Sequence, residues 1–284
     1  MNQEKIALIT DSTCDLSLDE LSELNIHLLP LKVVYQDRQY QDRVEIQPEE
    51  VYATIDEEAP GTSTPSPGEA LALFEKLRDE GFSHAISMHI SGGLSGTADA
   101  VRTVSKQFQS MKIEVIDSKG LSMALGFQVM EASRALREGL RFEEIVKRVH
   151  DVRSRMNVFF VVKTLDYLRR GGRIGYVQAT LGGILDMKPI IGINEEGKYF
   201  TVAKVRGRKK SIAKVAELVA EYGRNKAINL AVVHGGAEEE GRGLLEQIKG
   251  MKDVKIKETF FGQIGPVLVV HTGPGLIGVA FYEA

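Results

Sequence analysis

The stretch HISGGLSGTA, from His89 to Ala98, surrounds one serine hydroxyl at the apex of a predicted turn, that of Ser95, with three glycines. Three kinds of site use such a turn. The backbone amides of a glycine-rich loop bind phosphate, a sharp strand-to-helix turn presents a nucleophilic serine, and a hydroxyl at a helix start holds an anionic ligand. These alternatives imply a nucleotide enzyme, a hydrolase and a binding protein.

The first two alternatives each lack a residue that they require. SGGLSGTA has neither the Gly-Lys-Ser/Thr ending of a P-loop nor the pattern G-x-G-x-x-G. The stretch from Gly93 resembles the G-x-S-x-G nucleophile elbow, but Thr97 replaces the last glycine. His271 follows Ser95 in the chain order of an α/β-hydrolase, yet no acid is evidently placed to orient it. A serine esterase or lipase-like hydrolase using Ser95 and His271 stays open as the alternative function.

A carboxylate ligand requires less, because two or three hydroxyl or imidazole donors near helix N-termini bind it. Ser95, the loop with Thr62 and Ser63, and His271 supply such donors. His271 is expected at the end of an apolar strand, PVLVVHTG, where the sequence Gly-Pro-Gly forces a sharp turn. The aliphatic run LGGILDMKPIIGI would suit a cavity for an acyl chain, and ordinary core packing explains it equally well.

Metal and redox chemistry have little support in the sequence. None of the six histidines shows an H-x-x-x-H or H-E-x-x-H spacing, so we predict no metal and no cofactor. Cys14 is the only cysteine, which excludes an intramolecular disulfide and fits a reducing, cytoplasmic location. We expect no signal peptide and no integral membrane association, since no apolar run approaches the roughly 20 residues that span a bilayer.

The candidate residues must be positioned by the elements around them. In the first half, short apolar runs alternate with helix-period segments, and the predicted strands are KIALIT, HLLPLKVVY, HAISMHI and IEVID. Strands separated by helices predict a parallel sheet covered on both faces, with ligands at the carboxyl ends of the strands. Three hydroxyl-rich loops, TDSTCD, GTSTPS and SGGLSG, are therefore candidate parts of one polar site, although such residues also cap helices.

The second half has a different rhythm. Its apolar runs are mostly strands, tight turns such as NEEGK join several of them, and helices are expected at about 208–223 and 237–249. We therefore predict an α/β protein with two domains. An N-terminal, Rossmann-like parallel α/β domain spans 1–154, and a C-terminal α/β domain with a mainly antiparallel sheet spans 155–284.

Composition and charge indicate an ordinary soluble protein. The 284 residues are 43% hydrophobic and 26% charged, and the formal net charge of −3 argues against nucleic-acid binding, which usually shows a basic excess. The segment from Lys163 to Lys210 contains 11 Lys or Arg residues and 4 Asp or Glu residues, a net charge of +7. Because the whole chain carries −3, the rest of the chain carries −10. This segment, the basic zone, indicates either a surface for a phosphate or acidic partner or a solvated surface.

Taken together, the motifs resemble the DegV family of bacterial fatty-acid-binding proteins. The resemblance runs along nearly the whole chain, in the segments ITDSTCDLS, TSTPSPGE, HISGGLSGT, VIDSK, LRRGGRIG, LGGILDMKPII, KVRGRKK and HTGPGLIG. No one segment is decisive, and their order and spacing carry the assignment. The family more usually has T-S-Q-P in the second segment, so Thr64 replaces a glutamine here while Thr62 and Ser63 match.

The resemblance implies that one long-chain fatty acid is the ligand, buried between or beneath the two domains. The residues that would hold its carboxyl group are Thr62, Ser63, Ser95 and His271. The protein would not be an enzyme by itself but the acyl-carrying subunit of a fatty acid kinase system. A separate ATP-dependent kinase would convert the bound carboxyl group to an acyl phosphate for phospholipid synthesis.

The same resemblance gives the basic zone a role. The residues expected to contact the kinase or the phosphate are Arg170, Arg173 and Arg206, of which Arg173 and Arg206 match the motifs better. Away from its kinase partner, the protein is expected to be a monomer.

Overall fold

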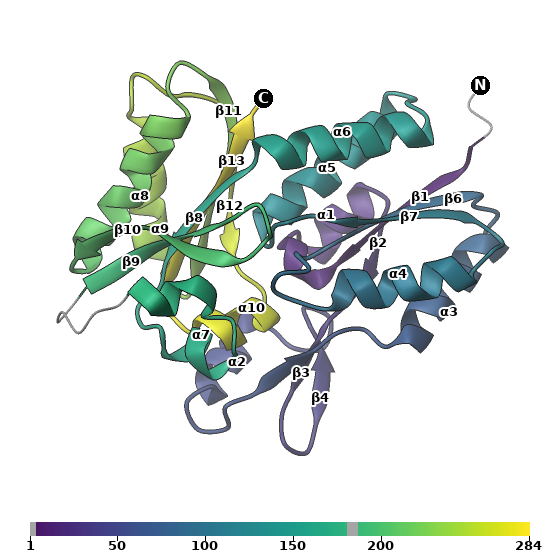
Figure 1. The fold of residues 1–284 in the computed structure, drawn as a ribbon, viewed down its shortest axis with the longest axis horizontal. Coiled ribbons are helices and arrows are strands. Elements are labelled where there is room, and N and C mark those ends of the chain that lie inside the picture. Colours follow the sequence, from purple (N-terminus) through teal and green to yellow (C-terminus); the bar gives the residue numbers. More distant parts are fainter. Residues whose placement is uncertain (1–3, 181–186) are drawn as a thin grey trace. The chain divides into compact units, whose positions relative to one another are not determined.

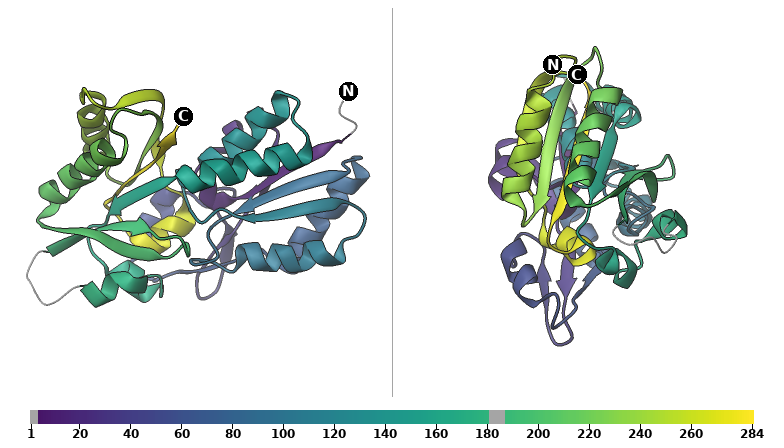
Figure 2. Two further views of the ribbon diagram at one scale, coloured as in Figure 1. Left: turned by 45° about the horizontal axis from the view of Figure 1, so that its top comes forward. Right: turned by 90° about the vertical axis from the view of Figure 1, so that its left-hand side faces the viewer.

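A computed structural model describes residues 4–180 and 187–284, and Figures 1 and 2 show its helices and strands. Of the aliphatic run LGGILDMKPIIGI, residues 181–186 lie outside the described residues. The chain forms two compact units. Unit 1 runs to Ile46 and resumes from Thr62 to Ser154, and unit 2 consists of Gln47–Gly61 and Arg155–Ala284.

Unit 1 is built on a four-stranded sheet whose neighbouring strands are all parallel, as predicted. In spatial order its strands are β2 (Ile26–Leu29), β1 (Ile6–Asp11), β6 (His84–His89) and β7 (Lys112–Asp117). Figures 1 and 2 show α3 (Pro67–Asp79) and α4 (Thr97–Gln107) on one face and α5 (Met123–Arg137) and α6 (Phe142–Arg155) on the other. Both faces are therefore covered, which explains the continuous apolar runs of the strands.

The predicted strand HLLPLKVVY is divided at Pro30. Because proline has no amide hydrogen to donate to a sheet, β2 ends at Leu29. A separate strand, β3 (Lys32–Val34), then pairs antiparallel with β4 (Gln39–Gln41) in a three-stranded sheet of order β4-β3-β5, where β5 is Gly61–Ser63. Two short helices complete this unit, η1 (Ser12–Cys14) and α1 (Leu18–Glu23).

Unit 2 contains a six-stranded sheet that is antiparallel except for one edge pair, in agreement with the predicted fold class. In spatial order its strands are β10 (Tyr199–Arg206), β9 (Met187–Ile193), β8 (Asn157–Val161), β13 (Leu276–Glu283), β11 (Ala227–Gly235) and β12 (Lys255–Gln263). The helices α8 (Arg208–Tyr222) and α9 (Glu238–Lys249) pack together on this sheet around a buried apolar core. The remaining helices are α2 (Pro48–Thr54), α7 (Asp166–Arg170), η2 (Gly175–Thr180) and α10 (Pro266–Thr272).

The segment Gln47–Gly61 belongs to unit 2 although it lies far from the rest of that unit in the sequence. Its helix α2 contacts α10, and the Gln263 amide donates to Glu49 Oε1 at 2.6 Å. The Tyr167 hydroxyl donates to Asp56 Oδ1 at 2.7 Å. These contacts join residues more than 100 positions apart, so no local pattern indicates them.

The prediction that PVLVVHTG is a strand was wrong, because the segment forms the helix α10. Gly265 is the N-cap, and Pro266 occupies the first helical turn, where its fixed φ suits a helix and its missing amide hydrogen is not needed. The helix ends at Thr272, and Gly273 is its C-cap, with a φ of +66°. Its residues are buried on nearly every side, and an all-apolar run of this length does not distinguish a buried helix from a buried strand.

A buried carboxylate joins β1 to β6 in unit 1. Asp11 Oδ1 accepts from the backbone amide of Thr13 at 3.0 Å and from its hydroxyl at 2.6 Å. Asp11 Oδ2 lies 2.8 Å from the Ile90 amide nitrogen and 3.1 Å from His89 Nδ1, and His89 Nε2 lies 2.7 Å from Ser87 Oγ. Asp11, Ser87 and His89 have no exposed surface, so every member of the network depends on the others for its hydrogen bonds.

We expect Asp11→Ala to lower the free energy of unfolding by about 3–5 kcal/mol, because it leaves buried donors without an acceptor. Chemical denaturation at pH 7 measures this loss. Asp99→Ala is the matched control, since the Asp99 side chain is 79% exposed and pairs with Arg102, and it should cost about 1 kcal/mol or less. Equal effects of the two substitutions would contradict a structural role for Asp11.

Candidate functional site

Ser95 lies in the loop between β6 and α4, at the carboxyl end of the parallel sheet. The amides of Leu94 and Ser95 both donate to the carbonyl of Ser91 at 3.0 Å, which closes a tight turn. The Ser95 hydroxyl lies 2.8 Å from that of Thr97, the first residue of α4, and accepts from the Thr97 amide at 3.3 Å. The partly exposed hydroxyl is therefore held beside the N-terminus of a helix, where the helix dipole favours an anion.

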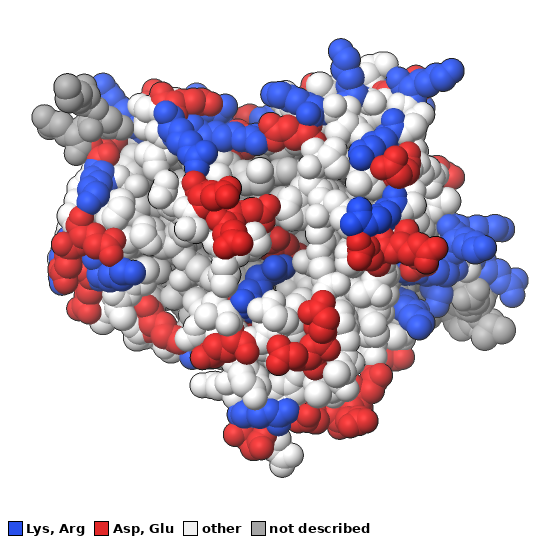
Figure 3. Space-filling model, turned by 180° about the vertical axis from the view of Figure 1, so that it is seen from behind, with Lys and Arg blue, Asp and Glu red and all other residues white. Residues whose placement is uncertain are grey.

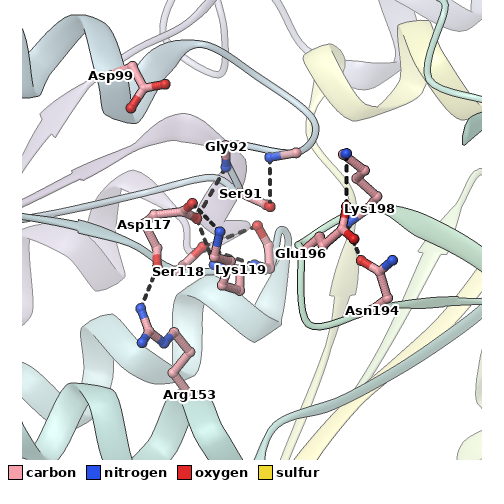
Figure 4. Close-up of polar contacts among 12 residues, drawn as sticks. Ser91, Gly92, Asp99, Asp117, Ser118, Lys119, Arg153, Asn194, Glu196 and Lys198 are labelled. Atoms are coloured by element: carbon pink, nitrogen blue, oxygen red, sulfur yellow. Dashed lines mark hydrogen bonds and ion pairs between the residues drawn. The ribbon is translucent and has the colours of Figure 1, made fainter.

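A second carboxylate, that of Asp117, lies against this loop (Figure 4). Asp117 is the last residue of β7, and its Oδ1 accepts from the Gly92 amide at 3.1 Å and from the Lys119 amide at 2.9 Å. The ammonium of Lys119 lies 2.9 Å from Asp117 Oδ2, and Arg153 donates to the Asp117 carbonyl at 3.0 Å. Burial raises the pKa of Asp117, but the hydrogen bonds and the Lys119 charge outweigh it and the net shift is downward.

The other two hydroxyl-rich loops divide between structural and candidate binding residues. In TDSTCD, the Thr13 hydroxyl bonds Asp11 and the Ser12 hydroxyl accepts from the Leu31 amide at 3.1 Å, so both are structural. In GTSTPS, Ser66 caps α3 in a reciprocal pair with Glu69. Thr62 and Ser63 lie on β5, outside this cap.

Ser63 is exposed, and its hydroxyl donates to the Thr64 carbonyl at 3.2 Å. Thr62 is partly buried. Both belong to unit 1 together with Ser95, whereas His271, Arg170, Arg173 and Arg206 belong to unit 2. The seven residues predicted for the site are thus divided between the two units.

His271 lies in the last turn of α10, in a close-packed setting that glycines make possible. A Cβ atom on Gly171 would stand 2.2 Å from His271 Nδ1, so only glycine leaves room for the imidazole. A Cβ atom on Gly273, two residues after His271, would stand 2.1 Å from the ring of Tyr167. The segment Tyr167–Gly171 therefore packs directly on the end of α10 and fixes where His271 can lie.

The electrostatics of this setting keep His271 neutral. Burial lowers the pKa of His271, and the Arg173 guanidinium lowers it further, to about 4. Arg173 is itself oriented by a hydrogen bond to the Gly171 carbonyl at 2.6 Å. A neutral imidazole donates one hydrogen bond, so at neutral pH His271 suits an anionic ligand as a donor and not as a cation.

Arg170 and Arg206 have different surroundings. The Arg170 guanidinium lies over the Tyr167 ring at 5.0 Å and donates to the Ile55 carbonyl at 3.2 Å. With Asp56 and Tyr167 it lines a surface hollow of about 430 Å³. Arg206 is exposed at the end of β10.

On the face drawn in Figure 3, Lys and Arg side chains alternate with Asp and Glu, and neither sign forms one continuous surface.

Three side chains that resemble nucleophiles, those of Cys14, Ser87 and Ser95, are unsuited to that role. Burial raises the pKa of the Cys14 thiol to about 12, so it stays protonated. Ser87, His89 and Asp11 form a serine–histidine–aspartate chain, but it has no exposed surface and a substrate cannot reach it. Ser95, which is accessible, has its hydroxyl bonded to Thr97 instead of an imidazole.

Among residues 4–180 and 187–284, no helix is long and apolar enough to cross a membrane.

Asp11, Asp117, Tyr167 and Gly171, which contact the Ser95 loop or the end of α10, were not among the residues predicted from the sequence. Asp11 and Asp117 are the last residues of β1 and β7 and stand in the segments ITDSTCDLS and VIDSK, which was the available signal. The roles of Tyr167 and Gly171 depend on packing against α10, which no local pattern indicates.

Comparison with known proteins identifies what the chain is similar to. A sequence model described as "Uncharacterised protein, DegV family" matches residues 5–284. A DegV domain-containing protein of Clostridium acetobutylicum is 41% identical over 280 residues, which cover 99% of each chain.

Solved structures show the same fold over nearly the whole chain. A fatty-acid-binding DegV family protein of Thermus thermophilus is 32% identical with a TM-score of 0.92, covering 99% of this chain and 100% of that chain. A stearic-acid-binding protein of Eubacterium ventriosum is 28% identical with a TM-score of 0.88, covering 99% and 98%.

The low pKa of His271 predicts a pH-dependent stability. An unfolded imidazole binds a proton near pH 6.5 and the folded one only near about 4, so stability is complete above the first value and falls as the pH drops toward the second. We expect wild type to lose about 2 kcal/mol more than His271→Gln in unfolding free energy between pH 7 and pH 5, because a group with a pKa of about 4 stays unprotonated in the folded state over this range. Guanidinium titrations of both proteins measure the difference, and identical losses would exclude a buried neutral His271.

Proposed function

We propose that this chain, which belongs to the DegV family, binds one long-chain fatty acid and presents its carboxyl group to a separate ATP-dependent kinase. The observation that carries the proposal is the near-complete structural match to solved proteins described as fatty-acid-binding, one of which is a DegV family protein. The local chemistry supports the same ligand class. A carboxylate needs hydrogen-bond donors at a site that favours negative charge, and the Ser95 loop offers both.

In this proposal the carboxylate accepts hydrogen bonds from Ser95, from the Thr62 and Ser63 loop, and from the neutral imidazole of His271. The amides at the start of α4, an 11-residue helix, add a favourable dipole. Hydrogen bonds to a charged group contribute about 1.5–3 kcal/mol each, whereas burial of the acyl chain supplies affinity in proportion to its apolar area. The polar residues therefore orient the head group more than they retain the chain.

The kinase step is proposed for the partner and not for this chain. The partner transfers the γ-phosphoryl group of ATP to a carboxylate oxygen, and the products are ADP and an acyl phosphate. The acyl phosphate then enters phospholipid synthesis. Charge accumulates on the transferred group, and cations near it lower the barrier. We propose that Arg170, Arg173 and Arg206 contact the kinase or this phosphoryl group. Arg173 is close enough to His271 to lower its pKa, which supports a place beside the head group.

We expect the purified protein to carry a fatty acid that organic extraction and mass spectrometry detect. After delipidation, Ser95→Ala and His271→Ala should each weaken oleate binding about 10-fold, the equivalent of one lost charge-assisted hydrogen bond. Calorimetric titration measures the affinity. Ser105→Ala is the matched control, because Ser105 lies on α4 and its hydroxyl bonds only the Arg102 carbonyl within the helix.

Absence of any extracted fatty acid, together with ester hydrolysis that disappears in Ser95→Ala, would replace this proposal with the serine hydrolase alternative. Wild-type affinity in both variants would remove Ser95 and His271 from the binding site. Thermal unfolding of every variant separates a loss of binding from a loss of folding.

Charge reversal at Arg173 should affect the kinase step more than ligand binding. We expect Arg173→Glu to keep oleate affinity within about threefold and to lower the rate of acyl phosphate formation at least 10-fold, because it places a negative charge near the phosphoryl group. The assay combines the loaded protein with a purified fatty acid kinase and labelled ATP. Arg169→Glu is the control, since Arg169 is exposed on α7 and pairs with Asp166. If binding alone collapses in Arg173→Glu, Arg173 belongs to the pocket.

A further inference from the structure

We infer that Asp117 is a positioning residue for the ligand site, because its carboxylate holds Gly92 and thereby sets the turn that presents Ser95. The inference rests on the proposed function, in which Ser95 contacts the ligand. All of the contacts involved lie within unit 1 and join the end of β7 to the loop after β6 (Figure 4).

The Asp117 carboxylate is held in one orientation. One oxygen accepts the amides of Gly92 and Lys119, and the other pairs with the Lys119 ammonium. Only 18% of the side chain is exposed, so water competes little for these bonds. Strand pairing places His89 opposite Asp117, which brings the residues after the two strand ends side by side.

The Asp117 carboxylate occupies the space that a side chain at position 92 would need. A Cβ atom on Gly92 would stand 2.9 Å from Asp117 Oδ2 and 3.7 Å from its Cγ, and no other residue crowds that position. The backbone of Gly92 is not in the left-handed region, and the residue is exposed. The close approach of Asp117 is therefore the steric reason for glycine here.

Hydrogen bonds pass this constraint along the loop to Ser95. The Gly93 amide donates to the Ser91 hydroxyl at 3.1 Å, and the Ser95 amide donates to the Ser91 carbonyl at 3.0 Å. The Ser91 amide in turn donates to the Gly120 carbonyl at 2.8 Å. The Ser91–Gly120 hydrogen bond does not involve Asp117 and would remain in its absence. Substitution of Asp117 should therefore disturb the turn locally and leave the fold intact.

The charge of Asp117 does not oppose an anionic ligand. The Lys119 ammonium and two backbone amides offset it, and they keep the carboxylate ionised at neutral pH. Asp117 therefore serves as a fixed acceptor for Gly92 under the conditions in which a fatty acid carboxylate binds.

A double-mutant cycle on oleate affinity tests the coupling of Asp117 to Ser95. In delipidated protein, Asp117→Ala should weaken binding about 10-fold, and adding Ser95→Ala should then cost less than about threefold, because Ser95 is already misplaced. Asp117→Asn should bind within about threefold of wild type, since the amide oxygen still accepts from Gly92. Glu143→Gln is the control, because Glu143 is an exposed partner of Lys112 elsewhere in unit 1.

Gly92→Ala provides a second route if Asp117→Ala fails to fold. The new methyl group would push the Asp117 carboxylate away, so Gly92→Ala should weaken oleate binding about as much as Asp117→Ala does. In an Asp117→Ser background, where the shorter side chain leaves room for the methyl group, Gly92→Ala should have no further effect on binding. Additive effects of Asp117→Ala and Ser95→Ala, or wild-type affinity in Asp117→Ala, would overturn this inference alone. Failure of wild type to bind oleate would instead overturn the proposed function.

Discussion

Two carboxylates accept hydrogen bonds from the backbone just after β6 in unit 1, and these bonds hold the loop that carries Ser95, a residue of the proposed head-group site. Asp11 on one side accepts the amide of Ile90, and Asp117 on the other accepts the amide of Gly92. A backbone amide buried or confined at a strand end needs an acceptor, and a carboxylate is a strong one. These bonds hold the loop that carries Ser95 in one conformation, and such preorganisation would lower the entropic cost of binding the proposed ligand.

In unit 2, close packing positions the candidate residue His271, whereas in unit 1 carboxylates position the loop that carries Ser95. Gly171 and Gly273 allow the segment Tyr167–Gly171 and the helix α10 to approach until no side-chain carbon fits between them. The imidazole of His271 is enclosed as a result, and its pKa falls to about 4. The same contact that positions the ring thus also decides its charge. A neutral ring can donate a hydrogen bond at a lower desolvation cost than a buried cation.

The arrangement around Ser95 favours holding a ligand over attacking one. A nucleophilic serine needs an imidazole to accept its proton, and here the Ser95 hydroxyl bonds Thr97 at the start of α4. The serine–histidine–aspartate chain that unit 1 does contain is sealed inside the sheet and supports the backbone. Such a site fits the proposed system, in which this protein would orient the carboxyl group and a separate kinase would supply the phosphoryl group.

The sequence by itself determined the parallel and antiparallel sheets and the family, because strand alternation, helix periodicity and the order of the motifs can all be read along the chain. It also drew attention to Ser95 and His271 by residue type. Only the tertiary structure decided that PVLVVHTG is a helix, that Gln47–Gly61 joins unit 2, and that Asp117 supports the Ser95 loop. Each of these depends on contacts between residues distant in the chain. A buried apolar run fits helix or strand equally well, and a carboxylate's partner cannot be read from its neighbours in sequence.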